Sequence, residues 1–289
     1  MLTTKQKINY FFMKLIPKTL YIKLRFFFIQ GYFPNLKDPK KFTEKLQWRK
    51  LKDNNKLFSL CADKYAVREY IKNRIGEEYL IPIYLITDIL TKEEFEKLPN
   101  SFVLKTTNGS GNSAVKIIKD KKLVKYEELK EFFENCKKID VGDYTMESWY
   151  SSIPCKVMAE KLLDIKTVDD YKFHSFNGEK FFIEHLVERD KIKGILKSNF
   201  YDENWNKLNF TIGTEMYDYD IKKPKNFDKM IEIVKKLSKD FDYVRVDLYN
   251  IDGEIYFGEL TFCPDGGFGK FTDEEWDSKF GSYWKIKNN

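Results

Sequence analysis

Histidine and cysteine are both scarce in this 289-residue chain, which narrows the chemistry that it can support. With only His174 and His185, neither a histidine-rich metal site nor a Ser-His-Asp arrangement is easy to build, and we interpret both as structural residues. The cysteines have no C-x-x-C spacing, so we expect buried apolar side chains, no disulfide framework and a reducing cytoplasm. They are Cys61, Cys136, Cys155 and Cys263.

Long apolar runs are also absent, since none approaches the roughly 20 residues that a membrane helix needs. We expect no secretory signal, because no apolar core with a small-residue cleavage site follows the N-terminal lysines.

A hydrophobic content of 42% and an aromatic content of 17% predict a folded protein of one compact unit or two to three lobes. The net charge of +6 mildly favours anionic partners such as nucleotides, phospholipids or acidic glycans, and is too weak to imply nucleic acid.

Two early segments allow more than one interpretation. Residues 1–33 are basic and aromatic, as in an amphipathic segment on an anionic membrane surface. We favour the alternative, a pair of short helices that are broken at Pro17 and pack on the body of the protein. Farther on, Asp63, Lys64 and Arg68 fall on neighbouring helical turns, either as an exposed charge ladder or as part of an anion pocket.

A stretch near the C-terminal end places charged side chains in apolar strands. Residues 244–262 predict a β-hairpin that contains Arg245, Asp247 and Glu259. Charged side chains in such strands are rarely buried unless they are paired or bind a metal. We therefore interpret the two carboxylates as ligands for a hard cation and the arginine as a clamp for an adjacent anion. A solvated hairpin with a surface salt bridge is the alternative.

The length of the hairpin loop decides whether the two acids meet. A three-residue loop over 251–253 puts Arg245 opposite Glu259 and Asp247 diagonal to it, at roughly 7–8 Å, within reach of one Mg²⁺. A two-residue Asp-Gly loop would send the acids to opposite faces. We favour the longer loop, because it leaves one apolar face, formed by Val244, Val246, Leu248, Leu260 and Phe262.

Residues 101–118 predict two strands that are joined by a glycine loop. Backbone N–H groups of such a loop can close on phosphate oxygens, and Lys105 on the first strand can supply positive charge. No G-K-[ST] follows, so this is not a Walker loop, and an ordinary turn is the alternative. The loop consists of Asn108, Gly109, Ser110, Gly111, Asn112 and Ser113.

Other segments predict the structure around these motifs. We expect strands over 156–163, 169–176 and 180–184, and an amphipathic helix over 226–241. Residues 266–269 predict a second loop that is rich in backbone donors.

Five segments taken in order resemble a known family: KFTEK (41–45), DKYAVR (63–68), LKTTNGSG (104–111), DYKF (170–173) and FGELTF (257–262). They resemble the ATP-grasp superfamily and, more closely, its TupA-like family, which is found with surface-polysaccharide genes. The resemblance covers the chain from about residue 30 onward. It implies an α+β fold in which two lobes grip ATP.

The same resemblance implies a division of the chain into three parts. Residues 1–100 would form a helical N-terminal region, residues 101–160 the central ATP-grasp lobe with the glycine loop, and residues 161–289 the C-terminal lobe with the metal site.

The matching residues imply how ATP is bound. Lys105 is similar to the lysine that contacts the nucleotide phosphates, and the glycine loop to the one that covers them. Lys172 would bind a phosphate and Asp170 the ribose hydroxyls. The adenine edge would be read by backbone groups at the hinge residues, which are Glu160, Lys161 and Leu163.

The resemblance also implies the catalytic and metal residues. Asp247 and Glu259 are similar to the two magnesium carboxylates, whereas Thr261 stands where the superfamily commonly has an asparagine ligand. The transferred phosphoryl group would be steadied by Arg245, with Arg189 or Lys270 as further candidates.

The expected reaction is the ATP- and Mg²⁺-dependent ligation of a carboxylate, a uronic acid or amino acid of a glycan precursor, to an amine. A sugar kinase would use the same ATP site. If the chain were a glycosyltransferase with Asp169 and Asp170 as its acidic pair, the hairpin would have no role. If it were a degenerate scaffold, it would not need an intact Lys105, Asp247 and Glu259. We expect a cytoplasmic protein, with peripheral membrane contact if residues 1–33 provide it.

Overall fold

The computed structural model describes residues 4–109, 114–163, 169–190, 195–219 and 221–286, and for 4–9, 187–190 and 195–196 only the backbone. Its internal contacts group the chain into two compact units. The first unit comprises Met1–Tyr21, Asn55–Tyr70 and Leu80–Ile165, and the second comprises Ile22–Asn54, Ile71–Tyr79 and Lys166–Asn289. Each unit combines helices with an antiparallel sheet, as the α+β prediction requires. The division at residues 100 and 160 remains a prediction.

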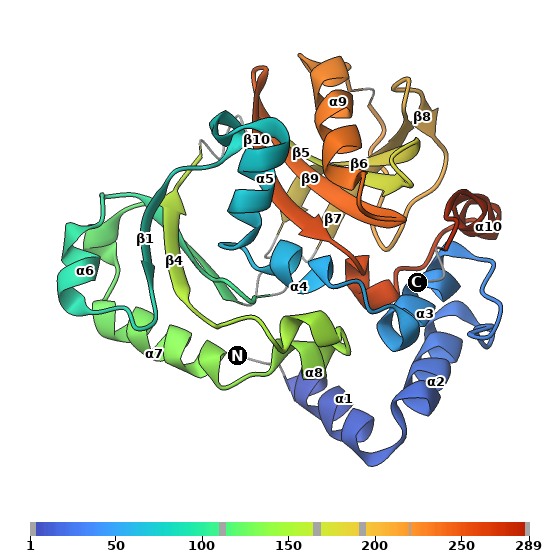
Figure 1. Ribbon diagram of the computed structural model, residues 1–289, viewed down its shortest axis with the longest axis horizontal. Coiled ribbons are helices and arrows are strands. Elements are labelled where there is room, and N and C mark those ends of the chain that lie inside the picture. The colour runs from blue at the N-terminus through green and yellow to red at the C-terminus, as the bar shows by residue number, and fades with distance from the viewer. Residues whose placement is uncertain (1–3, 110–113, 164–168, 191–194, 220, 287–289) are drawn as a thin grey trace. The chain divides into compact units, whose positions relative to one another are not determined.

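The first unit is built on a four-stranded sheet in the order β1-β4-β2-β3. Its strands are β1 (Ile83–Thr87), β2 (Phe102–Thr106), β3 (Val115–Ile118) and β4 (Val157–Lys161). Helices α6 (Lys92–Lys97) and α7 (Tyr126–Lys137) lie beside this sheet (Figure 1). Phe102 and Leu104 alternate along β2 and are buried against Phe95 of α6 and Phe133 of α7, so the strand period of two residues points its apolar side at the helices.

Shorter elements complete the first unit: α1 (Thr4–Leu15), α4 (Leu57–Ala62), α8 (Val141–Thr145), and the 3₁₀ turns η3 (Lys121–Leu123) and η4 (Ser148–Tyr150). Helices α2 (Lys18–Gln30) and α5 (Val67–Ile75) begin in the first unit and end in the second. The expected break at Pro17 is confirmed, because α1 ends at Leu15 and α2 begins at Lys18. No helix among the described residues is long and apolar enough to cross a membrane.

The second unit is built on a six-stranded antiparallel sheet in the order β10-β9-β5-β6-β7-β8. Its strands are β5 (Asp169–Phe176), β6 (Lys180–Asp190), β7 (Ile195–Asp202), β8 (Lys207–Leu208), β9 (Tyr243–Ile251) and β10 (Glu254–Thr261). Its other elements are α3 (Phe42–Lys52), α9 (Phe227–Ser238), α10 (Glu274–Tyr283) and the 3₁₀ turns η1 (Glu77–Tyr79) and η5 (Pro264–Gly267).

Helix α9 covers one face of this sheet, as the helical periodicity predicts (Figure 1). Met230, Ile233, Val234 and Leu237 of this helix are buried, whereas Ile231 is half-buried. The expected apolar face of the hairpin is also confirmed, since all five of its residues are buried: Val244, Val246, Leu248, Leu260 and Phe262.

The opposite face of the same sheet packs on aromatic rings from α3 and α10. The ring of Phe42 lies 5.0 Å from that of Tyr243, and the rings of Phe182 and Phe280 stack at 4.1 Å. Arg49 of α3 is fully buried beside them and donates to the carbonyls of residues 243 and 262 at 2.8 and 3.1 Å. These contacts between distant parts of the chain fix the ends of β9 and β10.

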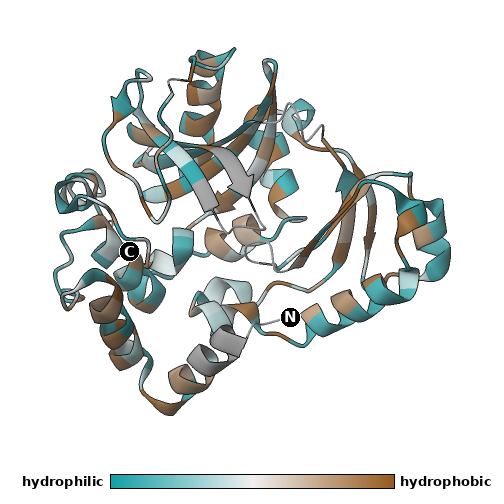
Figure 2. Cartoon of the chain, turned by 180° about the vertical axis from the view of Figure 1, so that it is seen from behind, coloured by the Kyte–Doolittle hydropathy of each residue, from teal (hydrophilic) through white to brown (hydrophobic). Residues whose placement is uncertain are grey.

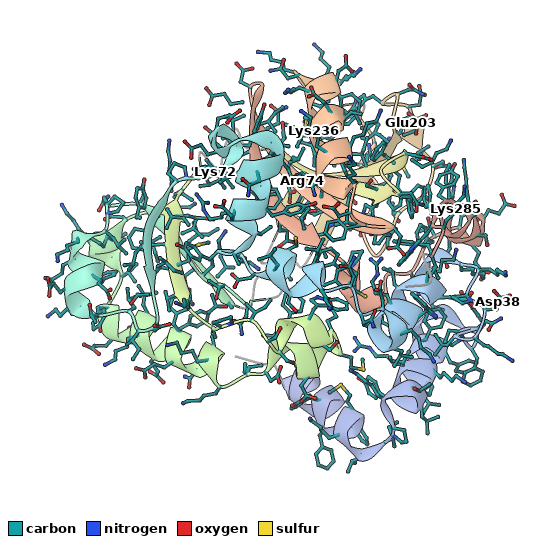
Figure 3. The ribbon with its side chains drawn as sticks, in the orientation of Figure 1. Asp38, Lys72, Arg74, Glu203, Lys236 and Lys285 are labelled. Carbon is teal, nitrogen blue, oxygen red and sulfur yellow. The ribbon has the colours of Figure 1, made fainter. Side chains whose placement is uncertain are left out.

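The side chains of the second unit also tie α5 to the end of α9. Arg74, labelled in Figure 3, forms an ion pair of 2.5 Å with Asp240, which follows α9. This pair anchors the half of α5 that belongs to the second unit.

The hairpin between β9 and β10 differs from the favoured prediction in its loop. Glu254 pairs with Ile251, so the loop has two residues, not three, and both have positive φ, 52° at Asp252 and 102° at Gly253. A β-bulge at Gly258 then shifts the register by one residue. The bulge cancels the effect of the short loop, and the acids still share a face.

Candidate functional site

The charged side chains of the hairpin meet on one face of the second sheet. Beyond the bulge, Glu259 pairs with Asp247 and Thr261 with Arg245, so the two carboxylates are direct cross-strand neighbours and not diagonal ones. The hydroxyl of Thr261 donates to Oε1 of Glu259 at 3.0 Å. The structure therefore brings the four predicted residues together, through a different register from the favoured one.

Arg245 binds every other member of this group. Its guanidinium donates two 2.7 Å hydrogen bonds to Asp247, one of 3.0 Å to Glu259 and one of 3.1 Å to Thr261. Burial lowers the pKa of Arg245, but Asp247 and Glu259 outweigh it and raise that pKa well above its usual value. The guanidinium is therefore a fixed positive charge, and it lies between two carboxylates whose mutual repulsion it offsets.

The charged row continues onto the neighbouring strand β5. Lys172 pairs with Asp247, and its Nζ lies 2.5 Å from Oδ2 of Asp170 and 3.5 Å from Oδ2 of Asp247. Burial lowers the pKa of Lys172, but the two aspartates outweigh burial and raise it. The two residues expected to bind ribose and phosphate thus adjoin the expected metal carboxylates.

Glu184 of β6 extends this row and was not among the predicted site residues. It pairs with Lys172 across the strands and is half-buried, and its side chain forms no hydrogen bond or ion pair with another described residue. Burial raises the pKa of this carboxyl to about 7, although Lys172 and Arg245 act to lower it. The sequence contained one sign of this residue, because Glu184 directly follows three apolar residues of its strand, where a charged side chain is unusual.

Two residues farther along each strand, the same face becomes aromatic. His174 is buried, stacks on Phe182 with ring centroids 4.0 Å apart, and shares a 2.9 Å hydrogen bond with the hydroxyl of Tyr243. Burial lowers the pKa of His174 well below its usual value, so the ring is neutral. His185 is buried on the other face, stacked on Tyr171 at 4.5 Å. Both histidines are structural, as expected.

In the first unit, Lys105 lies on β2 and its ammonium is 2.5 Å from Oε1 of Glu160 on β4. The two side chains are only 14% and 10% exposed. The hinge strand thus supplies a carboxylate partner for the predicted phosphate lysine. Lys161 is exposed and its N–H donates to the carbonyl of Pro82 at 2.9 Å, while Leu163 is half-buried just beyond the strand.

The base of the glycine loop is held by the turn before α5. The backbone N–H of Lys64 donates to the carbonyl of Thr107 at 3.0 Å, and its ammonium donates to the carbonyl of Gly109. A Cβ on Gly109 would lie 2.7 Å from Oγ1 of Thr106 and 2.9 Å from Cβ of Ala114, so only glycine fits there. Asn108 is buried, whereas Ser110, Gly111 and Asn112 lie outside the described residues.

The other charges of the 63–68 segment also bind backbone groups. Oδ1 of Asp63 accepts from the N–H of Tyr65 at 2.8 Å, and Arg68 donates to the carbonyl of Ile81 at 2.9 Å. Asp63, Lys64 and Arg68 are half-buried, which does not fit an exposed charge ladder, whereas the anion pocket stays a prediction. The segment positions the start of α5 and the strands near it.

The loop that follows β10 has left-handed backbone and is held by side chains of α3. Asp265, Gly266 and Gly267 have φ values of 52°, 59° and 74°. Gln47 donates to the carbonyl of Gly267 at 2.6 Å and Lys50 to that of Gly266 at 2.7 Å. Glycine adopts positive φ without strain, so only Asp265 carries a backbone cost in this loop.

The donor chemistry of the hairpin fits magnesium. Asp247, Glu259 and Thr261 offer carboxylate and hydroxyl oxygens, which hard cations prefer. No cluster of three or more histidine, cysteine or acidic residues suited to a metal is found in the described part of the chain. Mg²⁺ does not need one, because it is usually held by one or two carboxylates and by substrate phosphates.

Two further residues, Arg189 and Lys270, were candidates for steadying the transferred phosphoryl group. Lys270 is exposed, and the side chain of Arg189 lies outside the described residues.

The family model described as TupA-like ATPgrasp matches residues 44–285 of this chain. A search among curated proteins found no match. Solved structures similar to this chain include a D-alanine–D-alanine ligase from Bacillus anthracis, with 19% identity and a TM-score of 0.43 over 72% of this chain and 59% of that one. Another is a D-alanine–D-alanine ligase from Helicobacter pylori, with 16% identity and a TM-score of 0.40 over 78% and 62%.

A third is an N5-carboxyaminoimidazole synthetase from Staphylococcus aureus in complex with ADP, with 18% identity and a TM-score of 0.37 over 71% and 44%. The chain therefore spans less than two thirds of the length of these proteins.

Proposed function

Because the chain belongs to the TupA-like ATP-grasp family and has its α+β fold, we propose that it is an ATP- and Mg²⁺-dependent carboxylate–amine ligase. The observation that carries the proposal is the charged row on the second sheet, in which Glu259, Asp247 and Lys172 are consecutive cross-strand neighbours. Such a row offers oxygen ligands for a metal beside a cation for phosphate, which is what phosphoryl transfer requires.

Each residue has a specific task in this proposal. Lys105 and Lys172 would bind the phosphates, Asp170 the ribose, and the backbone of residues 160–163 the adenine. Asp247, Glu259 and Thr261 would hold Mg²⁺, which when bound neutralises negative charge on the phosphates. Arg245, fixed by four hydrogen bonds, would orient the transferring phosphoryl group or the acceptor carboxylate.

The reaction that we propose has two steps. An oxygen of the substrate carboxylate attacks the γ-phosphorus of ATP, ADP leaves, and an acylphosphate forms. The amine nitrogen then attacks the carbonyl carbon, phosphate leaves, and the nitrogen loses a proton as the amide forms. Such chemistry depends on positioning and positive charge more than on a strong base, which suits a site whose nearest histidine is neutral.

The substrates that we propose belong to surface polysaccharide of the capsular or teichuronic type. The carboxylate would be a uronic acid or amino acid on a sugar-nucleotide or lipid-linked precursor, and the enzyme would work in the cytoplasm, where ATP is available. This part rests on the setting in which the family is found.

The experiment measures ADP release with candidate uronic acids and amines. Release that requires both substrates supports a ligase; release with a sugar alone indicates a kinase, and stabilisation by a UDP-sugar but not by ATP indicates a glycosyltransferase. Lys105→Met and Glu259→Gln should each lower turnover at least about 100-fold. The controls are the exposed neighbours Lys116→Met and Glu254→Gln, which should retain it. Full turnover in Lys105→Met contradicts the proposal.

A further inference from the structure

The exposed apolar side chains of this protein are concentrated near its N-terminus. Of the fifteen large hydrophobic side chains that are exposed in the described residues, eight lie between residues 11 and 33. They are Phe11, Phe12, Leu15, Leu20, Leu24, Phe27, Phe28 and Phe33. Single exposed hydrophobic residues are common, but so many in one short stretch indicate an interaction surface.

Helix α2 is apolar on two opposite faces. Ile22 and Phe26, four residues apart, are fully buried and attach the helix to the protein. Leu24 and Phe28, also four residues apart, point the other way and are 36% and 81% exposed. The packing of α2 therefore uses one apolar face and leaves the second in water, and Figure 2 shows hydrophobic residues along this helix. The preferred interpretation of residues 1–33, helices packed on the body, accounts for only one of these faces.

Helix α1 has the same property. Phe11, Phe12 and Leu15 are 61%, 56% and 60% exposed, whereas Met13 is buried. Beyond α2, Phe33 is 58% exposed and stacks on Phe27 at a centroid distance of 4.6 Å. The two phenylalanine rings thus form an aromatic pair at the surface.

The charge of the same stretch has only one sign. The first acidic residue of the chain is Asp38, labelled in Figure 3, and it pairs with Lys40. Before it lie seven basic residues: Lys5, Lys7, Lys14, Lys18, Lys23, Arg25 and Lys37. Lys14 pairs with Asp143 and Arg25 lies over the ring of Phe268, but Lys23 and Lys37 form no ion pair with any described residue.

We propose that the exposed face of α2, with Phe33, docks on an anionic lipid surface. The phenylalanine and leucine side chains would enter the boundary between headgroups and acyl chains, and the basic side chains would contact the headgroups. A second copy of the chain fits less well, because a two-fold interface would press the same positively charged patch against itself. Lipid binding of this kind requires no bound ATP and does not depend on the reaction proposed above.

The test is co-sedimentation of the full chain, without nucleotide, with vesicles of phosphatidylcholine alone or mixed with phosphatidylglycerol. We expect binding to the anionic vesicles that falls with added salt. Phe28→Glu should lower the partition coefficient about tenfold. Lys23→Gln and Lys37→Gln should each lower it about fivefold on anionic vesicles alone. The last two variants leave the apolar faces intact, so they test the charge separately.

The matched control is Leu123→Glu, because Leu123 is 84% exposed but lies in η3 of the first unit. Binding that is equal on neutral and anionic vesicles, or absent from both, overturns the proposal. So does an equal loss in Phe28→Glu and Leu123→Glu. A dimer in light scattering that Phe28→Glu dissociates, without lipid binding by the wild type, assigns the surface to a second copy instead.

Discussion

Arg245 holds the candidate site together, and its replacement by methionine tests that statement. The guanidinium is 11% exposed and its main partner Asp247 is 6% exposed, so this is a buried ion pair. Loss of one partner of such a pair costs about 3–5 kcal/mol, because the other charge stays buried. Glu259 is 39% exposed, so its ion pair with Arg245 contributes little to the stability. Lys172, at 3.5 Å from Asp247, partly replaces the lost charge. We therefore expect Arg245→Met to lower the free energy of unfolding by about 3 kcal/mol.

The assay is urea unfolding of the metal-free and nucleotide-free protein, as a double-mutant cycle with Asp247→Asn. The double variant should be more stable than the sum of the single effects predicts, by at least about 1 kcal/mol, because each single variant leaves one unpaired charge. Lys229→Met is the matched control, since it breaks an exposed pair with Glu232 at 3.0 Å and should leave the stability unchanged. A coupling indistinguishable from zero would refute this account of the site.

Three further predictions concern the second unit. Gly258→Ala should cost about 1–3 kcal/mol of stability and lower ATP turnover, because its Cβ would lie 3.0 Å from the carbonyl oxygen of Asp247; unfolding and ADP assays check this. Burial raises the pKa of Glu184 from 4.5 to about 7, so the wild type loses stability as the pH rises through this interval. Glu184→Gln should thus match the wild type near pH 4.5 and exceed its stability at pH 8. Arg49→Met should cost about 3–5 kcal/mol in urea unfolding, because it leaves Asp242 unpaired, whereas no loss would mean that the buried arginine is dispensable.

Local patterns were sufficient for much of the fold. The spacing of Met230, Val234 and Leu237 predicted α9, and alternation along residues 244–248 identified the buried face of β9. Pro17 predicted the break between α1 and α2. In each case the physical cause lies within a few residues of the chain, namely backbone periodicity or a missing N–H group.

The hairpin register shows where local patterns fail. The Asp-Gly pair is the stronger turn signal, and it forms the two-residue loop that is observed. A longer loop was favoured only because it placed the two acids on one face. Both observations are satisfied by the bulge at Gly258. A glycine inside a strand is itself a signal for a bulge, and giving it more weight would have led to the observed register.

Contacts between distant segments were beyond the sequence patterns. Lys105 and Glu160 are 55 residues apart, and Arg49 binds backbone groups about 200 residues away. Nothing in the local sequence of either partner specifies the other, because strand order and helix docking decide such pairs. The place of Glu184 in the charged row was missed in part for this reason, since its strand marks an unusual acid but only the neighbouring strand places it beside Lys172.

The charge of the site itself argues for a divalent cation. Around the row on the second sheet, the described residues supply four carboxylates, those of Asp170, Glu184, Asp247 and Glu259, but only two basic groups, Lys172 and Arg245. If all four acids are ionised, the site lacks two positive charges. Burial makes such an excess costly, as the raised pKa of Glu184 indicates. One Mg²⁺ would supply the missing charge before any phosphate arrives, and each phosphate that enters would then need charge from elsewhere. That charge must come from basic residues outside this row, because Lys172 and Arg245 are already paired with its carboxylates.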